Sequence, residues 1–323
     1  MTRHNFDTVI ADRRNFLLSY AWPEHFGRHQ WHFPKHDGKV SWHMVGFVAY
    51  RTVILMYWIG SIIAQIVLKS SERNYFMIYF THWGALVEAA YFIAAWITSI
   101  VEFSRKRSSA VRPRPGQGSA RRPMHQWDNR TSWSQRLHWI LFTTTSVLTP
   151  TISAVYWIAL YKPDEWSVIN FHMHGVNLIL LTIDHLIVAT PIRLFHFWIP
   201  LPTGIAYGIF TVIYYVAGGT DPHQHRYIYP IINYGKNAGH AAGMLILVGF
   251  VIFPIIHVVV YGIYAAKLTL YILLYRRMVT TIAPRTNNDL SAEQDSVTYL
   301  GQDRTGATKS HHTSYESVGN TNV

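Results

Sequence analysis

Several apolar stretches of the chain are each close to the length of a transmembrane helix. An α-helix needs about 20 apolar residues to cross a bilayer core of about 30 Å. We therefore predict an all-α, six-span transmembrane helix bundle. Its spans are expected at residues 47–68, 75–101, 137–161, 168–190, 198–217 and 239–266.

The formal net charge of +11 is unevenly distributed, and this distribution predicts the topology. Cationic side chains crowd between the second and third spans, which is the positive-inside pattern of a cytoplasmic loop. An even number of spans then places both termini in the cytoplasm. Because these cations lie beside membrane spans, we expect no nucleic acid partner. They are Arg105, Lys106, Arg107, Arg112, Arg114, Arg121, Arg122, Arg130 and Arg136.

The chain divides into three parts by composition. We expect a cytoplasmic amino-terminal segment at residues 1–41, a membrane domain at 42–275 and a polar cytoplasmic tail at 276–323. Residues 102–136 within the membrane domain are rich in Pro, Gly, Ser and Arg, which indicates a flexible basic loop. This loop serves to set the topology, or it contacts anionic lipid. Residues 2–40 contain no run that resembles a cleavable signal peptide, so we expect the first span to act as the insertion signal.

The carboxyl end carries a possible partner motif. Thr321 at the third-last position and the terminal Val323 match a ligand that adds a strand to a PDZ domain. The alternative is a free tail. We expect an integral protein of the plasma membrane or an endomembrane, with membrane lipids as its other partners, and the oligomeric state is open.

Two polar residues in different spans are expected at a common depth. Thr81 lies about six residues into the second span and His174 about six residues into the fourth, and both spans enter from the non-cytoplasmic side. At ~1.5 Å per residue, both lie roughly 9 Å below that surface. An ionisable group at membrane depth is a functional candidate. We therefore predict a site that contains both residues.

Further polar residues are expected to support this layer. Glu88 follows Thr81 by two helical turns, and His185 follows His174 by three, so each pair lies on one stripe of its helix. Asp184 is adjacent to the second stripe, and His240 stands at the mouth of the sixth span. These groups either pair internally below a cavity or only join helices by hydrogen bonds.

Two other site chemistries were considered. The chain has no cysteine, which excludes disulfides and thiolate ligands. A haem could use histidines on facing helices, and the candidates are His174, His185, His240 and His257. A transporter is disfavoured because the two halves show no repeat. We expect no cofactor and no metal.

Several motifs together resemble the rolling stone family of multi-pass membrane proteins. The similarity runs in order from about Trp42 to Tyr275 and implies a role in cell–cell fusion during muscle formation. The motifs are Phe80-Thr81-His82-Trp83-Gly84, Val155-Tyr156-Trp157, His174-Gly175-Val176-Asn177, Thr190-Pro191-Ile192-Arg193-Leu194-Phe195-His196, Gly218-Gly219-Thr220-Asp221 and Tyr227-Ile228-Tyr229-Pro230.

Rolling stone proteins in turn distantly resemble the androgen-induced intramembrane hydrolases of fatty acid esters. Those enzymes use a threonine nucleophile and a histidine. Tyr79-Phe80-Thr81 is similar to their threonine motif, and His174 with Asp184 is similar to their histidine motif. A neutral imidazole can take the proton of the threonine hydroxyl and return it to the leaving alcohol. Two functions therefore remain open: an intramembrane lipid-ester hydrolase, and a non-enzymatic protein of cell–cell fusion.

Overall fold

The computed structural model describes residues 42–68, 70–111, 133–163 and 166–282, and the regular elements in these ranges are helices. The all-α prediction is confirmed. The longer helices are α2 (Trp42–Leu68), α3 (Phe80–Val111), α4 (Trp133–Val155), α6 (Asn177–Ile187), α7 (Leu201–Val216), α8 (Ala238–Leu247) and α9 (Phe253–Ile282). The shorter ones are η3 (Ser70–Ile78), η4 (Tyr156–Leu160), α5 (Val168–Phe171), η6 (His172–Val176), η7 (Leu194–Trp198), η8 (Pro230–Ile232) and η9 (Val248–Ile252).

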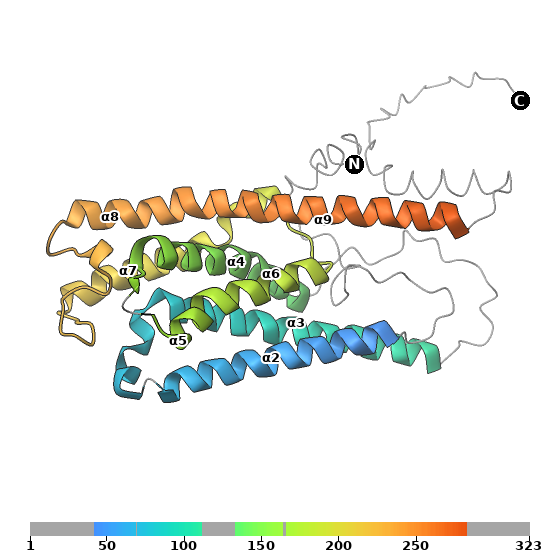
Figure 1. Cartoon of the computed structure of the whole chain (residues 1–323), viewed down its shortest axis with the longest axis horizontal. Coiled ribbons are helices and arrows are strands. Elements are labelled where there is room, and N and C mark those ends of the chain that lie inside the picture. The colour runs from blue at the N-terminus through green and yellow to red at the C-terminus, as the bar shows by residue number, and fades with distance from the viewer. Residues whose placement is uncertain (1–41, 69, 112–132, 164–165, 283–323) are drawn as a thin grey trace, which may run out of the picture. The chain divides into compact units, whose positions relative to one another are not determined.

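The chain forms two compact units, residues 1–272 and 273–323. The site described below belongs entirely to the first unit. Within that unit, α2, α3, α4 and α6 lie lengthwise beside one another (Figure 1), and α3 makes its most extensive contacts with α2 and α4. The predicted loop and tail sites at residues 112–132 and 283–323, including Val323, lie outside the described residues.

Four helical stretches are long and apolar enough to cross a bilayer. They are Met44–Leu68, Phe80–Ser104, Leu194–Val216 and Ala238–Leu274. These correspond to the first, second, fifth and sixth predicted spans. The other two predicted spans correspond to α4 and to the α5–η6–α6 run, which are not among the four. The apolar character of α4 is diluted by a buried hydroxyl-rich stretch of Thr143, Thr144, Thr145, Ser146, Thr149, Thr151 and Ser153.

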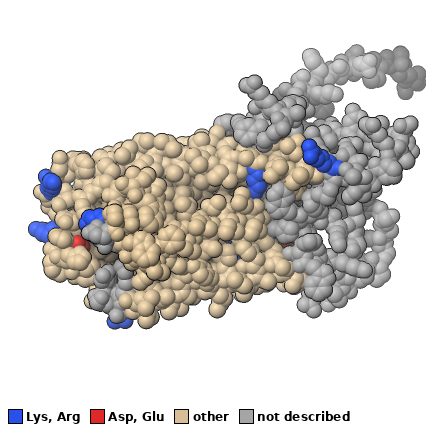
Figure 2. Space-filling model, in the orientation of Figure 1, with Lys and Arg blue, Asp and Glu red and all other residues tan. Residues whose placement is uncertain are grey.

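The outward faces of the bundle are apolar. Val53, Ile213 and Val258 expose 68%, 61% and 54% of their surface. On the face drawn in Figure 2, Lys, Arg, Asp and Glu are sparse over the helices. A large exposed apolar surface indicates contact with a partner or with a membrane. Because these helices are long enough to cross a bilayer, we infer that lipid covers this surface.

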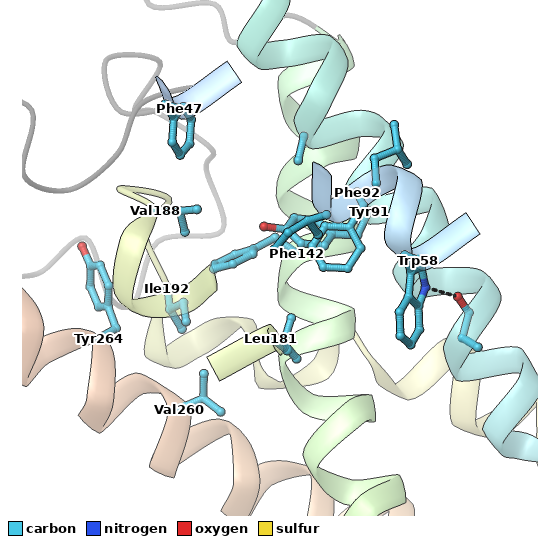
Figure 3. Close-up of a cluster of buried hydrophobic side chains, with 14 of the residues drawn as sticks. Phe47, Trp58, Tyr91, Phe92, Phe142, Leu181, Val188, Ile192, Val260 and Tyr264 are labelled. Carbon is cyan, nitrogen blue, oxygen red and sulfur yellow. Dashed lines mark hydrogen bonds between the residues drawn. The ribbon is translucent and has the colours of Figure 1, made fainter. Parts of the chain in front are cut away.

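Aromatic side chains fill the interior between the helices. Figure 3 shows Trp58 of α2, Phe92 of α3 and Phe142 of α4 in one cluster of buried side chains. The indole N–H of Trp58 donates to the carbonyl oxygen of Ala85 at 3.1 Å. This bond satisfies the polar atom of a side chain that is otherwise wholly apolar and joins α2 to α3.

The chain leaves the helical conformation after α6, and buried side chains satisfy the carbonyl groups of this segment. The ammonium of Lys267 donates to the carbonyl oxygens of His185 and Val188, each at 2.6 Å. The indole of Trp139 donates to the carbonyl oxygen of Pro191 at 2.7 Å. Irregular backbone at membrane depth requires such partners because hydrocarbon supplies none.

Candidate functional site

A large cavity opens among the ends of several helices of the first unit. Its volume is about 960 Å³, at the upper end of the roughly 300–1,000 Å³ typical of ligand pockets. Thr81 and His174 both line it. The two residues that sequence reasoning selected, from different helices, therefore line the same cavity.

Three π-helical turns border this cavity. They are η4, η6 and η9, and each is closed by a hydrogen bond between residues five apart. Pro254 lies two residues after the end of η9 and has no N–H to continue the regular ladder. A π-turn widens a helix locally and is frequent at functional sites. Three of them around one cavity favour a ligand-binding role for it.

Thr81 lies in the first turn of α3 and is held from the loop between α7 and α8. The backbone N–H of Phe80 donates to the hydroxyl oxygen of Tyr229 at 3.0 Å, which places this phenol next to Thr81. Burial raises the pKa of the Tyr229 phenol, which therefore stays protonated at neutral pH. The loop residues Tyr229 to Ile232 themselves line the cavity.

The backbone of this loop explains how it reaches back to the bundle. Gly218 has φ +80°, a conformation that favours glycine. A Cβ on Gly219 would meet the Tyr214 ring at 2.4 Å. The carboxylate of Asp221 accepts the backbone N–H groups of His223 and His225 at 2.9 and 2.7 Å. These local constraints fold the loop over the cavity.

His174 lies in η6 and is 7% exposed. Its ring stacks on the Tyr156 ring of η4, with 3.7 Å between centroids and 6° between planes. Two of the three π-turns thus present facing aromatic groups to the cavity. The stacking fixes the plane of the imidazole and leaves its edge as the part that can exchange a proton.

The two candidates are offset by about one helical turn. The side chain of Asn177 on α6 lies within hydrogen-bonding reach of the Glu88 carboxylate on α3. Thr81 precedes Glu88 by seven residues, whereas His174 precedes Asn177 by three. The difference of about four residues corresponds to roughly 6 Å along the helix axis.

Asp184 lies apart from the cavity in a buried ion pair. Its carboxylate binds the guanidinium of Arg51 on α2 at 2.7 Å, and both side chains are almost fully buried. The hydroxyls of Tyr50, at 2.9 Å, and Tyr91 also donate to it. Asp184 does not line the cavity, so its visible role is to join α2, α3 and α6.

Glu88 and His185, for which an internal pair or helix–helix hydrogen bonds were both considered, bond separate hydroxyls of α4. The Thr149 hydroxyl donates to Glu88 at 2.9 Å, and the Ser146 hydroxyl lies 2.7 Å from Nε2 of His185. Nδ1 of His185 lies 2.8 Å from the carbonyl oxygen of Leu181. The structure thus shows helix–helix hydrogen bonds, the simpler of the two roles considered.

The other histidines considered as haem ligands are either hydrogen-bonded or do not line the cavity. His240 is exposed in the first turn of α8 and is not among the residues that line the cavity. Nε2 of His257 lies 2.9 Å from the carbonyl oxygen of Arg193. Both ring nitrogens of His185 are in use, which leaves none for iron. Within the described ranges, no group of three or more His, Cys, Asp and Glu side chains is placed to hold a metal ion.

Sequence reasoning did not select four polar residues of the interior, which are Arg51, Gln65, Thr151 and Tyr229. Arg51 and Gln65 each interrupt an apolar run, and the rule that flags ionisable or polar groups at membrane depth would have found both. Gln65 lines the cavity, as does Thr151, and Gln65 Oε1 and Thr151 Oγ1 are buried with no hydrogen-bond partner among the described residues. Tyr229 is part of a quoted motif, but its position next to Thr81 depends on the tertiary fold.

The fold and the cavity together define an all-helical membrane protein whose interior holds polar groups and a ligand-sized space. The family described as protein rolling stone matches residues 4–284, and the chain belongs to that family. It is similar to the protein rolling stone of Drosophila melanogaster, with 27% identity over 227 residues, which cover 68% of this chain and 78% of the relative. No solved structure matches the chain.

Proposed function

We propose that this protein is a six-span membrane protein that hydrolyses lipid esters, with Thr81 as nucleophile and His174 as general base. The observation that carries the proposal is that both side chains line one cavity. His174 takes the proton of the Thr81 hydroxyl through one bridging water, and the threonine oxygen attacks the ester carbonyl. The alcohol leaves with that proton, and water then hydrolyses the acyl-threonine.

The walls of the cavity favour an acyl-chain substrate. Most of its lining side chains are aliphatic or aromatic, contributed by α7, α8 and η9 among others. Such a surface stabilises an alkyl chain at roughly 25 cal/mol per Å² of apolar area removed from water. Lipids of the surrounding bilayer are the natural source of such chains.

A fluorophosphonate ester probe tests this proposal on the purified full-length protein. We expect covalent labelling, because an activated hydroxyl attacks phosphorus as it attacks an ester carbonyl. Thr81→Ala should abolish labelling. Thr182→Ala is the matched control, since the Thr182 hydroxyl bonds its own helix at the carbonyl of Leu178 and is exposed. Absence of labelling in the parent protein contradicts the hydrolase.

The alternative is a non-enzymatic role in cell–cell fusion, which the rolling stone resemblance implies. Membership of the family supports this alternative. The two functions separate cleanly, because a fusion assay with the Thr81→Ala variant would be unaffected if no catalysis is involved. A PDZ partner at Val323 and residence in the plasma membrane or an endomembrane are part of the same proposal.

The proposed topology has both termini and the basic loop at 102–136 in the cytoplasm. An epitope inserted at Gly118 should be inaccessible to antibody in intact cells and should become accessible after permeabilisation, because arginines resist transfer to the outer side. An epitope after Gly235, in the loop between α7 and α8, is the control and should show the opposite behaviour. Staining of the Gly118 epitope in intact cells would show that the orientation is the opposite of the one proposed.

A further inference from the structure

Glu88 is a fully buried carboxylate whose hydrogen-bonding capacity is only partly used. Its Oε2 accepts the Thr149 hydroxyl at 2.9 Å, and the Asn177 side chain is within hydrogen-bonding reach. Neither Oε1 of Glu88 nor Oδ1 of Asn177 has a hydrogen-bond partner among the described residues. Glu88 is 0% exposed and Asn177 is 7% exposed. Two neighbouring buried side chains thus each carry an acceptor oxygen that lacks a donor among the described residues.

The cations of the interior are engaged elsewhere. Arg51 pairs with Asp184 at 2.7 Å, and the Lys267 ammonium donates to two carbonyl oxygens at the end of α6. The third buried cation, Arg193, lies over the Trp139 ring, 5.0 Å from its centroid. Within the described ranges, no Lys or Arg forms an ion pair with Glu88. An uncompensated carboxylate at this depth is costly, so either a proton or a bound cation must neutralise it.

We propose that Glu88, Thr149 and Asn177 bind a sodium ion between α3, α4 and α6. Carboxylate, hydroxyl and amide oxygens are the ligands that hard cations take. One carboxylate supplies a single negative charge, which matches a monovalent ion. The amide of Asn177 can present its oxygen by turning about its last bond, and a cation removes the repulsion between that oxygen and Glu88. This site is separate from the proposed hydrolysis.

The position of the site gives the ion a structural consequence. Asn177 follows His174 by three residues, so the site lies about one turn below the cavity. An ion that joins three helices there stabilises the folded state by mass action. The measurable result is a melting temperature that depends on sodium, whether or not the protein hydrolyses esters.

Thermal unfolding of the purified full-length protein in non-ionic detergent tests the site. Sodium chloride is titrated against choline chloride at constant ionic strength and pH. We expect a saturable rise in Tm of several degrees with sodium. Glu88→Gln should remove this dependence and should melt in choline at or above the temperature of the parent. Glu102→Gln, on the same helix outside the site, should retain the full sodium response.

Thr149→Val keeps the side-chain volume and removes one ligand, so it should raise the half-saturating sodium concentration about tenfold. If Glu88→Gln fails to fold, the sodium dependence of Thr149→Val still tests the proposed ion site. Equal melting in sodium and choline would overturn the proposal. An unchanged sodium response in Glu88→Gln would also overturn it, as would a response to pH alone, which would mean that a proton neutralises Glu88.

Discussion

Replacing Thr81 or His174 by Ala should lower lipid-ester hydrolysis by roughly a thousandfold or more, because each change removes the nucleophile or its base. Both residues line the same cavity, and neither change removes a large buried side chain from the core cluster. The double variant should be no slower than the slower single variant. When a nucleophile and its base act together, removing either one already abolishes their joint contribution to the rate. Initial rates on a long-chain ester in detergent micelles measure this.

His172→Ala is the matched control for His174. His172 lies two residues earlier in η6, contacts Tyr57, and has Nε2 3.4 Å from the Ser61 hydroxyl on α2. It does not line the cavity. Its loss should change the rate less than about threefold. If Thr81→Ala and His174→Ala both hydrolyse esters at the rate of the parent protein, the proposed hydrolase mechanism is wrong and the fusion role is the remaining function.

Breaking the Arg51–Asp184 pair should cause the largest loss of stability of any substitution considered. Removing one partner leaves a buried charge without compensation, which costs about 3–5 kcal/mol. We therefore expect Arg51→Met and Asp184→Asn each to lower the free energy of unfolding by about that amount. Tryptophan fluorescence during denaturant unfolding in micelles measures it.

The double variant Arg51→Met with Asp184→Asn distinguishes the effect of an unpaired buried charge on stability from the effect of altered side-chain packing. It removes both charges, and the new amide oxygen still accepts the hydroxyls of Tyr50 and Tyr91. We expect it to lose less stability than the two single variants together. Arg226→Met is the surface control and should change the free energy of unfolding by less than about 0.5 kcal/mol. Additive losses in the double variant would show that the pair contributes no coupling.

Much of the helical frame was predictable from the sequence. The length of an apolar run and its hydropathy are local properties, and four of the predicted spans correspond to helices of membrane length. The remaining two predictions were less secure because α4 is hydroxyl-rich and because α5, η6 and α6 divide one run into short pieces. Helix breaks of this kind depend on the partners that satisfy the backbone, which lie elsewhere in the chain.

The candidate site was predictable only as a pair of residues. Counting residues from the helix ends brought Thr81 and His174 to similar depth, and the structure adds that both line one cavity. The partners of the other polar groups were not predictable. Asp184 pairs with Arg51, 133 residues away, and Tyr229 bonds the backbone at Phe80, 149 residues away.

The sequence by itself determined which segments are helical and apolar, because burial in lipid is a property of each segment alone. Only the tertiary structure decided which polar groups meet. The rotation of each helix about its axis follows from how side chains pack against neighbouring helices. A change of that rotation by a fraction of a turn would exchange the partners of Glu88, Asp184 and His185 without any change in hydropathy, and so the chain's pattern cannot specify them.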